Sequence, residues 1–436
     1  MHNSTHVLKL AIPFLLLSCT AIDTEKTPAS HEITRDALNI VDRFENTLAE
    51  KLLHLAFQDI QGAKNSEQFQ IVDTHRRKLK KSLDISRLSP SNQRQLRLFE
   101  HLWQTERSKS DMVKTGAVRP YMETLKLEPS ISSNAVDLSL QAYEKLSKLH
   151  AKIRLLTKMP EQVSLESLFE TSRNNPENYL PNTHAGRQKY LDLMVDSLIK
   201  IERLLPAVYS GQHGEFILAG DENRKANQLF IYDRAAKTLN IDLGDMTQLP
   251  LYEIDSVAAY YGIPGMHTIS SIRSSEIQSL ISLPGYAAGW AAYITSSLNR
   301  GSPVQLPNSE LMRSYFEAMI ISLAVADIGL HSENWSVDQA TEFVISSSPY
   351  PVTRLKNSIL VAARMPGVFS APLLARLQFE TLQEQSKELL QHDFVLSEFQ
   401  LTILNPGLLP FSELQKVVAD WTKQKTPANQ THDPDQ

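Results

Sequence analysis

Three ionisable side chains in the middle of the chain, His267, Asp327 and His331, have the chemistry of a catalytic or metal site. Asp327 and His331 are four residues apart, so on a helix they share one face. Two histidines and one carboxylate bind a transition metal when they converge. Asp327 and His331 could equally form a structural Asp–His pair, and His267 could be a hydrogen-bonded histidine of the core. His267 lies on a separate segment, so the sequence does not show whether the three residues converge. The three are therefore candidates without a fixed role.

The common signatures of enzyme families are absent from the sequence. It contains no GxSxG, P-loop or GxGxxG motif, which argues against the commonest serine hydrolases, NTPases and dinucleotide-binding enzymes. The dipeptide His31-Glu32 lacks the second histidine of HExxH. The 44 basic and 49 acidic residues give a net charge of −5, so no basic excess favours nucleic acid as a partner.

The N-terminus has the pattern of an export and lipidation signal. The apolar run from Leu10 to Leu17 is too short for a bilayer, which takes roughly 20 residues. It ends in Ser18-Cys19, which resembles a bacterial lipobox, and Cys19 is the only cysteine. We expect a signal peptide over 1–18, a tether over 19–30 that is lipidated at Cys19, and a membrane anchor in the bacterial cell envelope. Because Thr20 and not Asp follows the cysteine, the pattern favours the outer membrane, facing the periplasm.

Apolar periodicity predicts a mostly α fold with a small antiparallel β-sheet. Residues 31–160 are predicted to form an N-terminal helical region, and residues 161–422 a second region. The sheet is expected within about 214–243, where three short β-like runs, 216–219, 229–232 and 239–243, are separated by polar turns. Helices are then predicted at 252–273, 286–299, 309–331, 336–346, 371–391 and 411–422. The polar residues 423–436 are predicted to be a disordered tail.

Three motifs that follow the predicted sheet carry a resemblance to a known family. Residues 260–267 read YYGIPGMH, residues 288–293 read AGWAAY, and residues 327–331 read DIGLH before Trp335-Ser336. These resemble, in order, the HExxPGHH, EGWAxY and DxGxH motifs of the bacterial domain-of-unknown-function family 885. Members of that family are regarded as zinc peptidases. The resemblance covers roughly residues 160 to 421 and implies a zinc-peptidase-like helical fold.

The departures from the family pattern fall on the residues that would carry the chemistry. Tyr260 and Tyr261 stand where the family has a zinc-binding histidine and its neighbouring glutamate. Met266 replaces another motif histidine and Ala288 replaces the glutamate of the second motif, so only His267 is kept. A tyrosine with a pKa near 10 is a poor metal ligand and a poor base. The resemblance therefore implies a degenerate member that lacks zinc and any other cofactor.

From this we expect a lipid-anchored pseudo-peptidase that binds a peptide, an envelope protein or a polymer without cutting it. Tyr260, Tyr261, Trp290 and Tyr293 are the binding candidates, although Trp290 and Tyr293 also fit a core. One alternative is an active hydrolase that uses a relocated metal or the remaining Asp and His residues. Another is a structural lipoprotein without a cleft. In a further alternative the tyrosines plug the space left by the zinc and close the groove, which leaves binding to an outer surface.

Overall fold

The structure is a computed structural model that divides into two compact units. It describes residues 5–6, 43, 46–56, 66–115, 121, 125, 134–160, 162–205, 215–223, 228–272, 283–298 and 309–425. The larger unit is formed by residues 1–10, 120–273 and 283–436, and the smaller by 11–119 and 274–282. Cys19, the predicted tether and all of the predicted signal peptide except residues 5–6 lie outside the described residues. No described helix has the length and apolar character needed to cross a membrane.

The smaller unit is helical. Its described part contains a helix over 46–56, α2 (Ser66–Ser82) and α3 (Pro90–Thr115), and α2 packs against α3. The apolar residues Leu96, Phe99 and Trp103 of α3 are buried, as the helical spacing of these positions in the sequence predicts.

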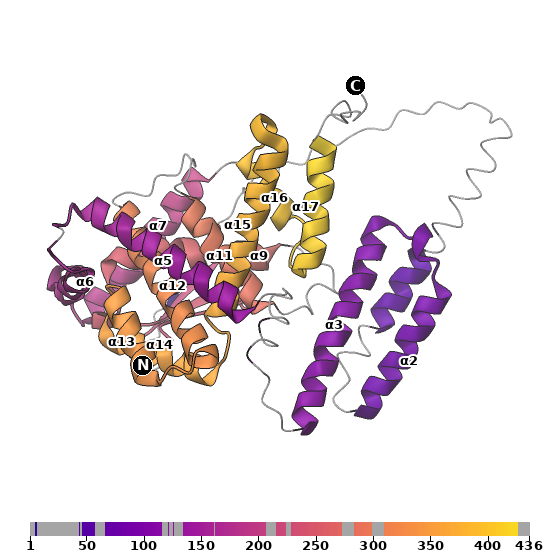
Figure 1. The fold of residues 1–436 in the computed structure, drawn as a ribbon, viewed down its shortest axis with the longest axis horizontal. Helices are drawn as coiled ribbons and strands as arrows, with labels where there is room; N and C mark the ends of the chain where they lie inside the picture. Colours follow the sequence, from indigo (N-terminus) through magenta and orange to yellow (C-terminus); the bar gives the residue numbers. More distant parts are fainter. Residues whose placement is uncertain are drawn as a thin grey trace. The chain divides into compact units, whose positions relative to one another are not determined.

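The larger unit contains most of the helices and the whole candidate site. Its described helices are α5 (Ala135–Thr157), α6 (Leu165–Asn174), α7 (His184–Leu204), α8 (Ile254–Tyr261), α9 (Met266–Ser271), α11 (Pro284–Ser297), α12 (Ser309–Ser332), α13 (Val337–Ser347), α14 (Val352–Arg364), α15 (Ser370–Leu390), α16 (Leu396–Leu404) and α17 (Phe411–Lys425). In Figure 1, α5 lies across α12, and α11 packs along α15. The last helix, α17, continues three residues into the segment predicted to be a tail.

The sheet is mixed, so the prediction of an antiparallel sheet is wrong. The strands β2 (Ile217–Asp221), β3 (Phe230–Asp233) and β4 (Thr238–Asp242) lie in the order β2-β4-β3. β3 and β4 form an antiparallel hairpin, whereas β2 and β4 run parallel. β4 lies between β2 and β3, and its Leu239 and Ile241 are fully buried. The strand β1 (Thr5–His6), which pairs with the outer side of β2, belongs to the predicted signal peptide.

The predicted helix over 252–273 is in fact two helices, α8 and α9, separated by the turn 262–265. Pro264 cannot donate a backbone hydrogen bond, so it interrupts a helix. Gly265 allows the chain to fold back on the end of α8. A Cβ at Gly265 would lie 2.0 Å from the carbonyl oxygen of Tyr260, so only glycine fits there. The indole Nε1 of Trp290 in α11 donates to the carbonyl of Pro264 over 3.0 Å and fixes this turn.

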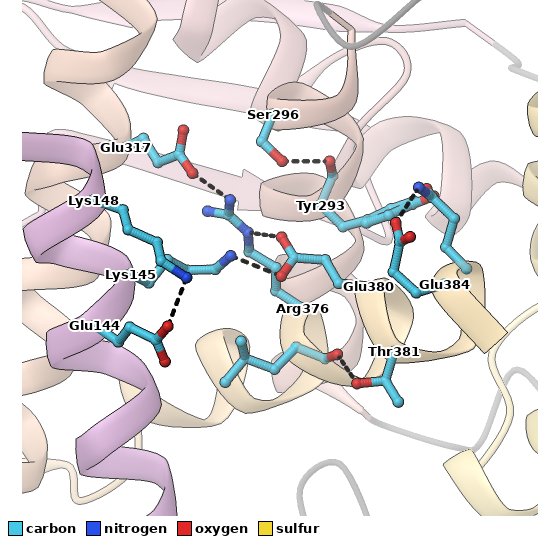
Figure 2. A network of polar contacts seen from close by, with 12 residues as sticks. Glu144, Lys145, Lys148, Tyr293, Ser296, Glu317, Arg376, Glu380, Thr381 and Glu384 are labelled. Atoms are coloured by element: carbon cyan, nitrogen blue, oxygen red, sulfur yellow. Dashed lines mark hydrogen bonds and ion pairs between the residues drawn. The ribbon is translucent and has the colours of Figure 1, made fainter. Parts of the chain in front are cut away.

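A buried ion network joins three helices of the larger unit. The guanidinium of Arg376, which is 1% exposed, bonds two carboxylates, Glu317 of α12 and Glu380 of α15 (Figure 2). Lys145 of α5 binds the second oxygen of Glu380 at 2.7 Å. A buried guanidinium is stable in a protein interior only when its charge and its donors are satisfied, and two carboxylates do this for Arg376.

Candidate functional site

A pocket of about 520 Å³ lies within the larger unit, between β3 and the helices α8, α9, α11, α12, α14 and α15. That volume falls in the range of small-molecule and cofactor sites, about 300–1,000 Å³. Most of the lining is apolar, from residues such as Phe230, Phe316, Met319, Leu323 and Val361. Its polar part includes Gln248, Arg354, Asn357 and Ser358.

The four positions at which the motifs depart from the family pattern converge on this pocket. Tyr260 and Tyr261 end α8, Met266 begins α9 and Ala288 lies on α11, and all four line the pocket. The turn 262–265 and the Trp290–Pro264 hydrogen bond bring the first two motifs together. The structure thus places the substituted residues at one site, although Met266 and Ala288 are 22 positions apart in the sequence.

The two tyrosines form part of the pocket wall. Tyr260, 9% exposed, packs edge-on against Tyr261 and Phe316. Tyr261 stacks on Phe230 of β3, with ring centroids 5.7 Å apart. Burial raises the pKa of Tyr260, and it raises the pKa of Tyr261 to about 12. Both phenols are therefore neutral at pH 7 and serve as apolar surface with a hydroxyl group.

The pocket does not fit the zinc ion that the family resemblance implies. Among the described residues that line it there is no histidine, cysteine, aspartate or glutamate. Zinc is bound in proteins by these side chains, and a neutral phenol or a thioether does not replace them. Elsewhere in the described part of the chain, no group of three or more such residues is arranged to hold a metal. The two-histidine, one-carboxylate arrangement considered from the sequence is not formed.

His267, the one motif histidine that is kept, lies in the core. It is fully buried and is not part of the pocket lining. Its Nδ1 is 2.9 Å from the hydroxyl of Tyr232 on β3, and its ring packs edge-on against Phe216 at 4.9 Å. His267 therefore connects α9 to the sheet and positions Tyr232, which does line the pocket.

Asp327 and His331 face each other on α12, as their spacing predicts, with Oδ1 and Nε2 3.6 Å apart. The carboxylate of Asp327 accepts hydrogen bonds from the backbone of Gly367, Phe369 and Ser370 and from the Ser370 hydroxyl. These bonds cap the start of α15. Burial raises the pKa of Asp327 against the effect of these donors. His331 is also bonded to the carbonyl of Ala362, at 2.9 Å from Nε2.

The other two binding candidates, Trp290 and Tyr293, are core residues. Trp290 is fully buried and Tyr293 is 2% exposed, and both pack against Phe379 of α15. Neither lines the pocket. Their role in this conformation is to hold α11 against α15.

The pocket runs along the edge of β3. Five successive residues, 228–232, line it, whereas a pocket over one face of a strand would contact alternate residues. In the described part of the sheet, β3 pairs only with β4. Asp242 donates to the carbonyl of Leu229, so Leu229, Ile231 and Asp233 are the residues bonded to β4. The backbone groups of Phe230 and Tyr232 consequently point away from β4.

Arg354 is the one charged residue of the described lining, and no motif in the sequence marks it. It lies on α14, a helix that was not predicted. Its Nη1 donates to the carboxylate of Glu253 over 2.7 Å and to the carbonyl of Gln248 over 3.2 Å. The guanidinium also lies over the rings of Tyr350 and Phe230. The apolar spacing of Leu355, Ile359 and Ala362 after Pro351 is the signal that could have revealed this helix.

Two solved structures share this fold. That of a candidate lipoprotein from Colwellia psychrerythraea matches with a TM-score of 0.61 and 16% identity, over 81% of this chain and 67% of that chain. That of a candidate lipoprotein of unknown function from Shewanella oneidensis matches with a TM-score of 0.53 and 13% identity, over 81% and 73% of the two chains. At these identities the likeness shows the fold alone. Comparison with curated proteins gives no match.

The family resemblance drawn from the motifs is confirmed by a family model. The model describes bacterial proteins of unknown function, DUF885, and matches residues 86–418, more than half of the chain. The match begins well before the motifs and includes all of α3 and α5. The chain belongs to the bacterial family DUF885.

Proposed function

We propose that this chain is a lipid-anchored protein of the bacterial cell envelope that binds an extended polypeptide segment in its pocket and does not cut it. The observation that carries the proposal is the course of the pocket along the outer edge of β3. An extended segment can pair with such an edge through its backbone, while its side chains enter the adjoining space. Phe230, Tyr260 and Tyr261 supply the aromatic contact surface.

We propose that the bound segment is not hydrolysed because of the side chains that form the described lining. Hydrolysis needs a group that activates water or a nucleophile, and that group must reach the bound substrate. The lining offers neutral phenols, amides, a hydroxyl and one guanidinium. The ionisable residues weighed from the sequence, His267 and Asp327, are hydrogen-bonded in the core. Pseudo-peptidase remains our proposal for this member of the family.

The anchor is proposed from the N-terminal pattern and from the names of the structural relatives. Two proteins of the same fold are called candidate lipoproteins. In this chain Cys19 closes a lipobox-like sequence after an apolar run. We propose that Cys19 carries the lipid and that the protein resides in the outer membrane, facing the periplasm, because Thr20 follows the cysteine.

Binding is tested with a library of acetylated decapeptides that have apolar residues at alternate positions and a free C-terminus. We expect a subset to bind the purified protein and to be recovered intact by mass spectrometry. For a bound peptide, N-methylation of one alternate set of amides should abolish binding, whereas N-methylation of the other set should not. Strand pairing predicts this alternation because only every second amide faces β3.

The location of the site is tested by filling the pocket. Ala288→Phe places a large side chain in the lining and should abolish peptide binding. Ala419→Phe, on the exposed face of α17, is the matched control and should leave binding unchanged. Binding that survives Ala288→Phe in a folded protein would place the site elsewhere. Cleavage of a bound peptide that is lost in Ala288→Phe would show that the protein is a hydrolase.

A further inference from the structure

We infer that the pocket takes the C-terminal end of a polypeptide and that Arg354 binds its terminal carboxylate. This inference rests on the proposed function and names the part of the ligand that the site recognises. Arg354 lies in the first turn of α14, its side chain is 9% exposed, and it lines the pocket beside Phe230 and Tyr261. A guanidinium at the wall of an apolar pocket selects an anionic group of planar shape.

The protein uses two of the five N–H donors of Arg354. Both of its hydrogen bonds, to Glu253 and to the carbonyl of Gln248, come from Nη1. Neither Nε nor Nη2 makes a hydrogen bond within the described residues, and neither is among the fully enclosed atoms without a partner. Three N–H groups therefore remain, and the parallel pair on Nε and Nη2 forms a fork for which a carboxylate in the pocket is the best acceptor.

The same chain shows what a satisfied buried guanidinium looks like. In Figure 2 Arg376 binds one carboxylate, Glu317, through Nη2 and a second, Glu380, through Nε. Arg354 has one carboxylate partner, Glu253, and lacks a second carboxylate. The ligand's terminal carboxylate would take at Arg354 the place that Glu380 takes at Arg376.

The charge of a second carboxylate is accommodated by the surroundings of Arg354. α14 has no acidic residue in its first turn and no side-chain cap, so its N-terminal partial positive charge is available to an anion. Burial raises the pKa of Glu253, which favours its neutral form when a second anion arrives. No other charged residue belongs to the described lining, so no lining carboxylate repels the ligand.

The remaining lining indicates what precedes the carboxylate. Arg354, Asn357, Ser358 and Val361 face the pocket at the spacing of one side of α14. From Arg354, the polar side chains of Asn357 and Ser358 lead toward apolar Val361. The ligand is therefore a chain with a free carboxylate, a backbone that pairs with β3 and apolar side chains in the part that contacts the apolar lining.

The decisive experiment compares the acid and amide forms of one peptide. A decapeptide that binds the wild-type protein is remade with a C-terminal amide, and both forms are titrated by calorimetry. We expect the amide to bind about 10- to 100-fold more weakly, since a charged hydrogen bond is worth about 1.5–3 kcal/mol. Equal binding of acid and amide overturns the inference and leaves the proposed function intact. Failure of both forms and of the whole library overturns the proposed function itself.

Variants then assign the effect to Arg354. Arg354→Gln alone leaves Glu253 buried without its partner, so it is combined with Glu253→Gln to keep a neutral pair. In this double variant the acid and amide forms should bind equally. Arg364→Gln, at the exposed end of the same helix, is the control and should keep the preference for the acid. A preference that persists in the folded double variant assigns the carboxylate to another group and overturns the role of Arg354.

Discussion

Gly289 of α11 is the residue at which the packing of the site's framework can be tested most directly. A Cβ at this position would lie 2.4 Å from Cβ of Ala375, 2.7 Å from the carbonyl oxygen of Pro372 and 3.0 Å from the amide nitrogen of Arg376. All three atoms belong to α15, and two of them are backbone atoms. Gly289→Ala therefore forces α11 and α15 apart and cannot be accommodated by a change of rotamer.

The expected loss of stability follows from two opposing effects. Overpacking a tight interface costs about 1–3 kcal/mol, and contact with backbone atoms favours the upper value. Alanine gains about 1 kcal/mol over glycine within a helix. The net loss should be about 2 kcal/mol, which for a domain of this size lowers the melting temperature by about 4 °C. Near-ultraviolet circular dichroism is suited to the measurement, because Trp290 and Tyr293 lie beside Gly289 at this interface.

A second substitution shows whether the contact itself causes the loss. Ala375→Gly removes the nearest atom and should cost about 1 kcal/mol alone, from helix propensity. The double variant Gly289→Ala, Ala375→Gly should be more stable than the sum of the two changes predicts, by about 1 kcal/mol. Relief is partial because the Pro372 carbonyl remains. A Gly289→Ala protein as stable as the wild type, or strictly additive changes, would falsify the close approach of α11 and α15.

Three further predictions concern the anchor, the ion network and the cap of α15. Cys19→Ala should abolish labelling by radioactive palmitate and release the protein from membranes or leave an uncleaved precursor, as fractionation would show. Arg376→Met should cost about 3 kcal/mol at pH 7, since it strands two carboxylates. Burial opposes ionisation of Glu317 and Glu380, but Arg376 outweighs it and lowers both pKa values below 4.5. The stabilisation that these ion pairs provide is thus present above about pH 4.5 and lost on acidification. Urea titrations should therefore show that the difference in free energy of unfolding between wild type and Arg376→Met shrinks below that pH. Asp327→Asn should cost about 1–3 kcal/mol in the same assay, because one carboxylate oxygen that accepts N–H groups becomes an amide donor.

Local features of the sequence predicted the helices well where the apolar spacing was regular. The expected helix at 309–331 corresponds to α12, Ser309–Ser332, and the three strand-like runs lie within two residues of β2, β3 and β4. The order of the strands depends on which strand has neighbours along both of its edges. Contacts between segments that are distant in the sequence decide this, and the local sequence pattern does not contain them. This is why the parallel pairing of β2 with β4 was not predicted.

The pocket was predicted only in part, for a similar reason. The motifs identified Tyr260, Tyr261, Met266 and Ala288, and these do line it. Arg354 was missed because its partner Glu253 is 101 residues away, so nothing near it in the sequence marks it as buried. The helix α14 itself was also not predicted, although its apolar positions Leu355, Ile359 and Ala362 recur at helical spacing between polar residues.

The residues that recur from the family's motifs share a structural purpose in this chain, so the shape of the pocket does not depend on the side chains that replace the other motif residues. Gly265 and Pro264 turn the chain after α8, Trp290 fastens that turn, and Asp327 holds the start of α15. None of these interactions involves a metal ligand. Substitutions at Tyr260, Tyr261, Met266 and Ala288 therefore change the chemistry of the pocket wall and leave its supports in place. A pocket supported in this way keeps its shape whatever side chains line its wall, and this is the physical basis of the binding function we propose.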